Sequence, residues 1–499
     1  MTDKKKIDEL INVRIDKLNN LKNAGIEPYP HSYLASKSIQ EIKENEDALI
    51  KSNDTISICG RIVSIRQLGK VLFLNIQSNF ERLQCYISNK NMLLDEDVYK
   101  ILINNIDIGD IVGIKGQMFY TKTNEFTLKC DVFTLLSKSI RPLPNLKQKE
   151  GEAFNTFDDK ELRYRNRHLD FITNPDNKKV FILRHKIVNS FREFLNSKSF
   201  IEAETPVLQP IYGGANARPF TTHHHTLNEK LYLRIAVELY LKRLIIGGFD
   251  KVYEISKNFR NEGMDRSHNP EFTMLEFYQS YSDVYDVMDL TENMIRSVAS
   301  SISSQTFSYD GNEIDFSNPF KQITLNELFE QEFKIKDLLS NEIKLREIAS
   351  SLNLNDDYDI GKIIDKIFSL KIEPNLVQPT FVLDYPKVLS PLSKIKRDQD
   401  DDIVERFELF IGGMEIANAF SELNDPIDQR ERFSAQEKLK DKGDEEAQVL
   451  DENFLEAIES GMPPTGGVGI GIDRVVMILT GNTSIKDVIL FPAMRNITS

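Results

Sequence analysis

Residues 251–278 read KVYEISKNFRNEGMDRSHNPEFTMLEFY. The stretch begins with strand-like alternation, passes through a middle rich in turn residues and then alternates again, which predicts two antiparallel β-strands joined by a loop. Along the second strand, one face carries Phe272, Met274, Glu276 and Tyr278. Because a carboxylate is costly to bury among apolar groups without a cationic partner, Glu276 marks this face as a candidate site.

The loop between these two strands is cationic. It carries Arg260, Arg266 and His268, and an arginine can hold phosphate oxygens through two parallel hydrogen bonds. A structural network of salt bridges is the alternative for the same side chains. The loop therefore indicates a phosphate site, with the ion-pair network left open.

A second polar stretch covers residues 405–425. Glu415 and Glu422 are seven residues apart, which on a helix would place them on one face. On the strand that the Gly412-Gly413 turn suggests, they would point to opposite faces unless a bulge intervened. If they converge near Asn418, their oxygens suit Mg²⁺ with bound phosphate. The spacing alone leaves both arrangements open.

A third stretch is rich in glycine and leads into an apolar helical pattern, with Asp473 available as the helix N-cap and Arg474 in the first turn. Gly-x-Gly before a helix also occurs in dinucleotide-binding folds, but no long parallel-sheet unit follows here. The dinucleotide interpretation is therefore weak. The glycines are Gly466, Gly467, Gly469 and Gly471.

Upstream of these stretches, the hydrophobic period changes to two. Five short β-rich runs separated by turn residues predict a small barrel, with the oligonucleotide-binding type as the obvious candidate. The runs are 56–65, 70–77, 81–88, 111–119 and 125–136.

Within this barrel, alternation separates a core side from an outward side. Phe73 falls on the outward side near Gln84 and Tyr86, a combination that can stack a nucleic-acid base and read its edge. The alternative is that another part of the protein covers Phe73. The predicted core residues are Leu72, Leu74, Ile76, Leu83, Cys85 and Ile87.

The N-terminal stretch predicts a helix, because apolar residues recur at three- and four-residue spacing from Ile7 to Leu21. Its other face carries Arg14, Lys17 and Lys22. A helix packed on its neighbour and an RNA-contacting helix are equally good interpretations.

The composition limits the class of protein. The chain has 499 residues, 63 Lys and Arg against 77 Asp and Glu, and a net charge of −14, which argues against a protein that coats nucleic acid through an overall basic surface. Its three cysteines form no CxxC pair, so neither a disulfide framework nor a structural zinc site is indicated. With no signal-peptide core and no apolar run of about 18 residues, we expect a soluble cytoplasmic protein that is neither exported nor bound in a membrane.

Taken together, the three constellations resemble the class II aminoacyl-tRNA synthetases, and the chain as a whole is similar to the lysine-specific branch of bacterial type. The stretch 200–206, which ends at Pro206, resembles the family's first motif, which builds a homodimer interface. Residues 259–273 are similar to the second motif and residues 469–474 to the third. The lysine-branch signatures lie at 163–170, 213–219 and 420–425.

This resemblance implies a mixed α/β fold, in which a five-stranded OB-fold barrel is followed by a core built on an antiparallel β-sheet flanked by helices. The corresponding domains are an N-terminal helical extension (1–55), the anticodon-binding barrel (56–137), a linker (138–160) that contains Pro142 and Pro144, and a catalytic domain (161–499) with a helical insertion (323–370).

The resemblance also implies an activity. Lysine would react with ATP and Mg²⁺ to give lysyl-adenylate and pyrophosphate, and the lysyl group would pass to the 3′-terminal adenosine of the lysine tRNA. Catalysis would rest on Arg260 and Arg474, and Mg²⁺ on Glu415 and Glu422. The implied ATP-binding residues are Arg260, Glu262, His268, Phe272, Glu415, Glu422 and Arg474. The implied lysine-binding residues are Gly214, Glu238, Glu276, Tyr278, Asn418 and Asn424, and the anticodon-reading pair is Phe73 and Gln84.

Three alternatives stay open at this point. An aspartyl- or asparaginyl-tRNA synthetase shares the barrel and the core, but its amino-acid pocket would need a cation where this chain offers Glu238 and Glu276. A paralogue that ligates lysine to a protein usually lacks the barrel. An inactive RNA-binding relative would have no use for the ATP and Mg²⁺ residues.

Overall fold

The computed structural model describes residues 1–499 except 1, 70, 93–94, 145, 150–151, 156–158, 303–304, 356–357, 398–401, 442–448 and 497–499. The chain divides into two compact units, Met1–Lys178 and Lys179–Ser499, and each is described by itself. Within the described ranges, no helix combines the length and the apolarity needed to cross a bilayer.

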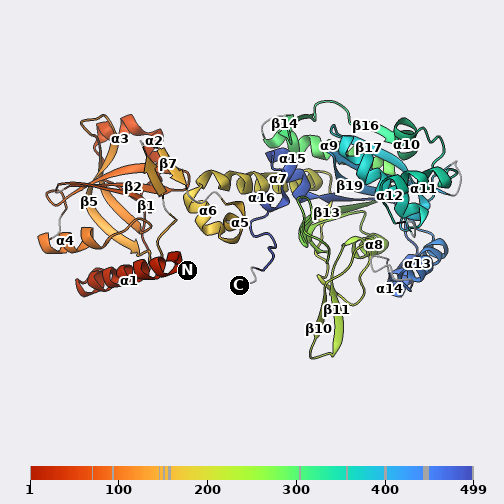
Figure 1. The fold of residues 1–499 in the computed structure, drawn as a ribbon, viewed down its shortest axis with the longest axis horizontal. Coiled ribbons are helices and arrows are strands. Elements are labelled where there is room, and N and C mark those ends of the chain that lie inside the picture. The colour runs from red at the N-terminus through yellow and green to blue at the C-terminus, as the bar shows by residue number, and fades with distance from the viewer. Residues whose placement is uncertain are drawn as a thin grey trace. The chain divides into compact units, whose positions relative to one another are not determined.

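The first unit contains a closed five-stranded barrel with the strand order β1-β2-β3-β5-β4, which confirms the predicted OB-fold (Figure 1). Every side chain predicted for its core is buried, so the alternation of the sequence identified the inner face correctly. The strands are β1 (Ile56–Leu68), β2 (Val71–Ser78), β3 (Glu81–Ser88), β4 (Ile111–Tyr120) and β5 (Phe126–Ser137), and α4 (Glu96–Asn105) connects β3 with β4.

The N-terminal helix α1 (Thr2–Asn23) uses its polar residues for packing. Arg14 donates hydrogen bonds to the carbonyl oxygens of Ser139 (2.9 Å) and Ile108 (3.0 Å), and Lys17 forms a 2.6 Å ion pair with Asp107. Of the apolar stripe, Leu21 is buried in the core of this unit, whereas Ile7, Leu10 and Ile15 stay exposed. These contacts favour the interpretation of a helix packed on its neighbour, and two of the basic residues considered for RNA are already engaged in that packing.

Short elements complete this unit. They are α2 (Ile39–Glu44), α3 (Glu46–Ser52), the hairpin of β6 (Leu146–Lys149) and β7 (Glu152–Asn155), α5 (Lys160–Arg165), α6 (Arg167–Thr173) and the 3₁₀ turn Pro175–Asn177. The hairpin lies within the predicted linker, part of which falls outside the described residues.

The second unit is built on one eight-stranded sheet with the order β16-β17-β18-β19-β20-β13-β12-β8. Its interior strands pair antiparallel, whereas β16 and β8 join the two edges in parallel. The pair predicted within 251–278 is present as β12 (Lys251–Phe259) and β13 (Glu271–Ser280). The other strands are β8 (Ile201–Glu202), β16 (Lys321–Thr324), β17 (Thr380–Pro386), β18 (Ile403–Ile411), β19 (Met414–Ser421) and β20 (Thr465–Gly471).

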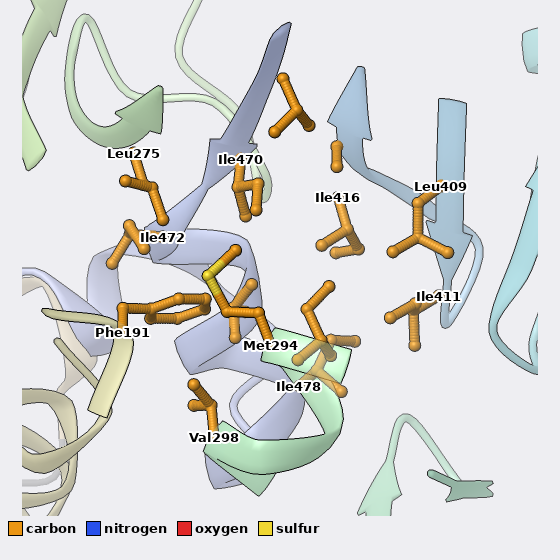
Figure 2. Close-up of a cluster of buried hydrophobic side chains, with 14 of the residues drawn as sticks. Phe191, Leu275, Met294, Val298, Leu409, Ile411, Ile416, Ile470, Ile472 and Ile478 are labelled. Carbon is orange, nitrogen blue, oxygen red and sulfur yellow. The ribbon is translucent and has the colours of Figure 1, made fainter. Parts of the chain in front are cut away.

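One face of this sheet is buried under the helices α7 (Lys178–Ser197), α9 (Val284–Ile302) and α15 (Ile472–Thr480). Figure 2 shows Leu275 and Ile470 from the sheet meeting Phe191 of α7 and Met294 of α9. Because neighbouring residues of a strand point to opposite faces, every second residue of the central strands belongs to this hydrophobic core. The remaining residues face the other side.

The segment predicted as a helical insertion contains α10 (Leu325–Phe333), α11 (Glu342–Ser351) and α12 (Ile360–Lys371). These helices share one hydrophobic cluster with Val382, Val404 and Phe410 of the sheet. They therefore extend the core of the second unit. Most of the segment 323–370 is helical, although residues 323–324 belong to β16 and residues 334–341 lie between α10 and α11; that the segment is an insertion stays a prediction.

The other elements of the second unit are mostly short. The hairpin of β10 (Thr221–His224) and β11 (Glu229–Leu233) projects away from the sheet (Figure 1). The rest are α8 (Glu238–Ile246), α13 (Pro426–Asp441), α14 (Glu452–Glu459), α16 (Ile485–Val488), β9 (Leu208–Gln209), β14 (Thr306–Tyr309), β15 (Asn312–Asp315) and the 3₁₀ turns Glu373–Asn375 and Lys387–Leu389. Some of them, such as β14, β15 and α16, add side chains to the hydrophobic core.

Candidate active site

A cavity of about 390 Å³ lies on the face of the central sheet opposite the hydrophobic core. On β13, Phe272, Met274, Glu276 and Tyr278 line it, whereas Leu275 and Phe277 belong to the core. The prediction that these four side chains share one face is confirmed, and that face is a wall of the cavity.

A bulge in β19 brings Glu415 into the cavity. The pairing with β18 shifts between Leu409↔Ala417 and Phe410↔Glu415, so Ile416 is the extra residue. Glu415 consequently lines the same cavity as Glu422. The sequence left this convergence conditional on a bulge, and the bulge is present.

The turn before this strand depends on glycine. Gly412 and Gly413 both have positive φ, 63° and 71°, as the tight two-residue connection of a hairpin requires. This turn places β18 beside β19 and so brings Glu408 into the cavity wall.

Glycine also makes room on β20. Gly467 lines the cavity between Glu422 and Tyr278, and a Cβ atom at this position would overlap Glu422 Oε1 and Tyr278 Cε1. The glycine stretch thus clears one wall of the cavity.

Three buried carboxyl groups gather at one end of the cavity, namely Glu238, Glu276 and Glu422. Lys242, fully buried one helical turn after Glu238, donates to Glu238 Oε1 at 2.5 Å and forms an ion pair with Glu422. Glu276 accepts a hydrogen bond from the Val237 N–H (3.4 Å) and one from the Tyr278 hydroxyl (3.2 Å). We call this group of side chains the acid end.

The acid end favours protons or other cations. Burial, reinforced by the charge of Glu238, raises the pKa of Glu276 to about 7. Burial also raises the pKa of Glu422 to about 8, although Lys242 opposes the shift. For Lys242 itself, burial lowers the pKa, but Glu238 and Glu422 outweigh it and the pKa is raised. The Lys242 ammonium therefore stays charged. It is a single positive charge among three carboxyl groups, so the acid end can accept further cations.

The opposite end of the cavity carries arginines. The Arg260 guanidinium lies over the Phe272 ring, 5.1 Å from its centroid, and burial lowers its pKa while Glu262 and Glu415 act against this. Arg474 donates to the Glu415 carbonyl oxygen at 2.6 Å. These positive charges beside an aromatic ring suit a phosphorylated ligand with a planar base.

His268 lies between Arg474 and an acidic residue of the same loop. One ring nitrogen is 3.2 Å from an Arg474 nitrogen, and the other is 2.8 Å from Asp265 Oδ2. These contacts join the loop after β12 to the start of α15.

Glu408 and Glu415 form an oxygen-rich corner near the arginines. Burial raises the pKa of Glu408 to about 7; Arg406 acts against this shift and the charge of Glu415 adds to it. Asn418 donates to Glu408 Oε1 at 3.4 Å and accepts from Arg406 at 3.2 Å. Glu408 also forms an ion pair with Arg406, as Glu422 does with Lys242 at the acid end.

The structure brings nearly all predicted site residues together. The cavity is lined by Gly214, Glu238, Arg260, Glu262, His268, Phe272, Glu276, Tyr278, Glu415, Asn418, Glu422 and Arg474. Asn424 does not line it: its side chain donates to the Met462 carbonyl and accepts from Lys394. Arg266 points elsewhere and pairs with Asp310 at 3.0 Å.

Asp473 does not cap its helix as predicted. Gly471 is the N-cap of α15, and the Asp473 carboxylate accepts from the Thr273 N–H (2.7 Å) and pairs with Arg184 (2.6 Å). It therefore fixes the start of α15 to β13 beside the cavity.

Three charged residues at this site were missed in the sequence, namely Lys242, Arg406 and Glu408. Lys242 lies four residues after Glu238, a spacing that predicts a helical ion pair. Glu408 could have been found from the Gly412-Gly413 turn, because a two-residue hairpin sets the strand before it beside Glu415.

The barrel of the first unit presents a row of aromatic side chains. Phe73 and Tyr86 pack edge to face with centroids 5.4 Å apart, and Tyr86 packs against Phe119 at 5.8 Å. The Arg66 guanidinium lies 5.3 Å from the Phe73 centroid. Gln84 is buried, and its amide donates to the Thr127 hydroxyl at 2.9 Å. The row can stack bases, while Gln84 would have to leave Thr127 to read one.

The stretch that ends at Pro206 lies at an edge of the second unit. Exposed apolar side chains in this part of the chain are Ile182 on α7, Ile201 on β8, Val207 just before β9 and Leu208 on β9. The stretch is tied to the sheet through the Thr205 hydroxyl, which donates to Glu254 at 2.7 Å.

Comparison with known proteins places these features in a family. A protein-family profile described as "tRNA synthetases class II (D, K and N)" matches residues 159–495, and one described as "OB-fold nucleic acid binding domain" matches residues 56–136. The chain is 47% identical over 495 residues to a "Lysine--tRNA ligase" of Carboxydothermus hydrogenoformans, which covers 98% of each chain. It is 48% identical to the protein of the same name from Porphyromonas gingivalis strain W83, over 97% of this chain and 85% of the relative. For the protein of that name from Moorella thermoacetica, the identity is 47% over 98% of each chain.

Proposed function

The chain belongs to the class II tRNA synthetases of the D, K and N group, and on that premise we propose that it activates lysine with ATP and transfers it to tRNA. Relatives that carry the name lysine--tRNA ligase match it over nearly its whole length. The lysine carboxylate attacks the α-phosphorus of ATP to give lysyl-adenylate and pyrophosphate. A terminal ribose hydroxyl of the tRNA then accepts the lysyl group.

The observation that supports lysine best is the charge of the acid end. Glu238, Glu276 and Glu422 face one ion-paired cation, Lys242, among the described residues. Three carboxylates with one ammonium leave a deficit of two positive charges. Lysine supplies two ammonium groups, whereas aspartate or asparagine would bring one and leave a buried carboxylate unpaired.

The roles of the other residues follow from their places in the cavity. Arg260 neutralises charge on the α-phosphate, with Phe272 stacking on the adenine. Arg474, held by the Glu415 carbonyl, contacts the nucleotide from the opposite side with Glu262 and His268. Positioning of the two reactants and stabilisation of the charge that develops supply the catalysis, and no protein nucleophile is required.

Mg²⁺ is proposed to bind at the oxygen-rich corner. Glu408 and Glu415 both line the cavity and interact electrostatically, and carboxylate oxygens are the ligands that Mg²⁺ prefers. The sequence named Glu415 with Glu422; we pair Glu415 with Glu408 instead, because the charge of Glu415 acts on Glu408, whereas Glu422 interacts with Glu238 and Glu276 of the acid end. No preformed cluster of three metal-binding side chains is found in the described part of the chain, so phosphate oxygens would complete the shell. Bound there, the metal neutralises phosphate charge.

Substituting one carboxylate at a time separates these two assignments. Glu408→Gln is expected to raise the Mg²⁺ concentration needed for half-maximal exchange by about tenfold or more and to leave the KM for lysine unchanged. Glu422→Gln is expected to raise the KM for lysine instead. Titration of Mg²⁺ and lysine in pyrophosphate exchange measures both. If Glu422→Gln raised the required Mg²⁺ concentration and Glu408→Gln raised the KM for lysine, Glu422 would be assigned to the metal site instead.

The proposed activity is tested by ATP–pyrophosphate exchange with single amino acids, followed by charging of transcribed tRNA. Lysine is expected to drive exchange, and aspartate and asparagine are not. Exchange driven by aspartate but not lysine would identify a different member of the group. Absence of exchange with every amino acid would favour an RNA-binding relative without catalysis.

The barrel is proposed to read the anticodon through Phe73 and Gln84. The aromatic row that includes Phe73 offers stacking surfaces, and each stacked base contributes roughly 1–3 kcal/mol. Gln84 would contribute an amide once its bond to Thr127 is released.

Phe73→Ala is expected to lower kcat/KM for tRNA charging by about ten- to a hundredfold, because one stacking contact is lost. Exchange without tRNA should keep its wild-type rate, since Phe73 lies in the barrel and is absent from the lining of the cavity. Both rates are measured on one preparation. An equal loss in the two assays would exclude an anticodon role.

We further propose a homodimer that covers the exposed apolar residues around Pro206, and a location in the cytoplasm. Burial of such side chains stabilises an interface, and the free thiols of Cys59, Cys85 and Cys130 suit a reducing compartment. Sedimentation of the protein as a monomer at micromolar concentration would contradict the dimer.

A further inference from the structure

Lys242 lies behind the carboxylates of the acid end. It is fully buried and absent from the lining of the cavity, so a bound substrate would not touch it. Its ammonium reaches Glu238 Oε1 and Glu422 Oε2, which lie on α8 and just after β19. Any effect of Lys242 on the substrate must therefore pass through these two carboxylates.

Lys242 contacts only one of the two carboxylate oxygens of Glu422. Its Oε2 faces Lys242, while its Oε1 has no hydrogen-bond partner among the described residues and lies against Gly467 at the cavity wall. Burial is the main cause of the raised pKa of Glu422, and the charge of Glu238 adds to it while Lys242 opposes it. Without the ammonium, Glu238 and Glu422 would therefore repel each other at low dielectric. Lys242 thus holds two like charges together and leaves one oxygen of Glu422 available to a cation.

A second buried lysine of this chain shows a different pattern. Lys138, in the barrel, also lies between two carboxylates, Asp107 (2.5 Å) and Asp110 (2.9 Å). Asp110, however, also accepts hydrogen bonds from the backbone N–H groups of Ser139 and Asp107. There the carboxylate is satisfied by the protein, as a structural ion pair requires. At Glu422 one oxygen is left over.

We propose that Lys242 is a positioning residue for specificity, which holds Glu238 and Glu422 so that the acid end accepts a second ammonium and discriminates against amino acids that lack one. The inference rests on the proposed function. The substrate class it implies is a straight-chain α-amino acid with a terminal amine. The neutral analogue that ends in a methyl group is the matched competitor.

Lys242→Met tests the proposal in lysine-dependent exchange. The KM for lysine is expected to rise about tenfold or more, with the KM for ATP and the kcat at saturating lysine unchanged. The ratio of kcat/KM for lysine to that for the neutral analogue should fall by a similar factor. Lys138→Met is the matched control, because it removes a buried lysine from a comparable ion pair in the other unit. It should leave both KM values unchanged.

A double-mutant cycle that combines Lys242→Met with Glu422→Gln measures whether the effect of Lys242 on the KM for lysine depends on Glu422. Because Lys242 acts through Glu422 as well as Glu238, the two substitutions together should raise the KM for lysine by clearly less than the product of their single effects. Additive effects would overturn the proposal, and so would a Lys242→Met variant with wild-type KM for lysine. If Lys242→Met does not fold, Lys242→Gln removes the charge while keeping a donor, and the same KM shift is expected. Absence of lysine-dependent exchange in the wild-type chain would instead overturn the proposed function.

Discussion

Arg260→Ala is expected to lower the rate of lysine-dependent pyrophosphate exchange by about 10²–10³-fold, the size of effect seen when one preorganised charge partner of a transition state is removed. Arg260 lies over Phe272 at the arginine end of the cavity, where it would meet negative charge that grows as the α-phosphorus is attacked. Its Nε has no hydrogen-bond partner among the described residues. The melting temperature is expected to stay near that of the wild type, because the substitution removes a buried charge together with its contact to the Phe272 ring.

Arg266→Ala is the matched control for this experiment. Arg266 belongs to the same loop but is exposed, pairs with Asp310 and is absent from the cavity lining. Its removal should leave exchange within about twofold, because exposed ion pairs contribute little. An Arg260→Ala variant with a normal exchange rate would remove Arg260 from the catalytic role.

Gly467→Ala is expected to raise the KM for lysine by at least about a hundredfold. The added methyl group would overlap both Glu422 Oε1 and Tyr278 Cε1, and these atoms belong to the acid end. To make room, both the Glu422 carboxylate and the Tyr278 ring must shift, and overpacking of this kind costs about 1–3 kcal/mol before any binding is lost. Steady-state exchange at varied lysine, with ATP saturating, measures the effect.

Gly471→Ala provides the comparison on the same strand and the same face. A Cβ there meets only Arg474 side-chain atoms at 3.6 Å or more, which is ordinary contact, and φ at Gly471 is −74°. We expect the KM for lysine to stay within about twofold of the wild type. Similar losses in both variants would mean that no added side chain is tolerated on this face of β20, and they would contradict the specific steric role assigned to Gly467.

Much of the fold could be predicted, because the decisive patterns are local. Alternation gave the barrel strands and their inner faces, and the two halves of 251–278 gave β12 and β13. The N-terminal helix shows the limit of this approach. Its spacing predicted the helix correctly, but its packing depends on Asp107 and the Ser139 carbonyl, which lie far away in the chain.

The site was harder to predict where it depends on register. The convergence of Glu415 and Glu422 on one cavity required a bulge at Ile416, and a bulge inserts one residue without any composition signal. The contact of Lys242 with Glu422 joins α8 to the end of β19, a pairing that only the tertiary fold creates. Asn424 belongs to the same signature as Glu422, but past the end of the strand its side chain turns toward Met462.

The central strands carry two sets of residues on one backbone. From Met274 to Tyr278 of β13, and after the bulge of β19 from Ala417 to Phe420, successive residues serve the hydrophobic core and the cavity in turn. Substitutions that repack the core can therefore accumulate while substrate chemistry stays constant, and the reverse also holds. The two sets depend on the register of the strand. Deleting a single residue within β13 would turn core side chains toward the cavity and cavity side chains toward the core. Over evolutionary time, we expect these strands to tolerate changes of residue type far better than changes of length.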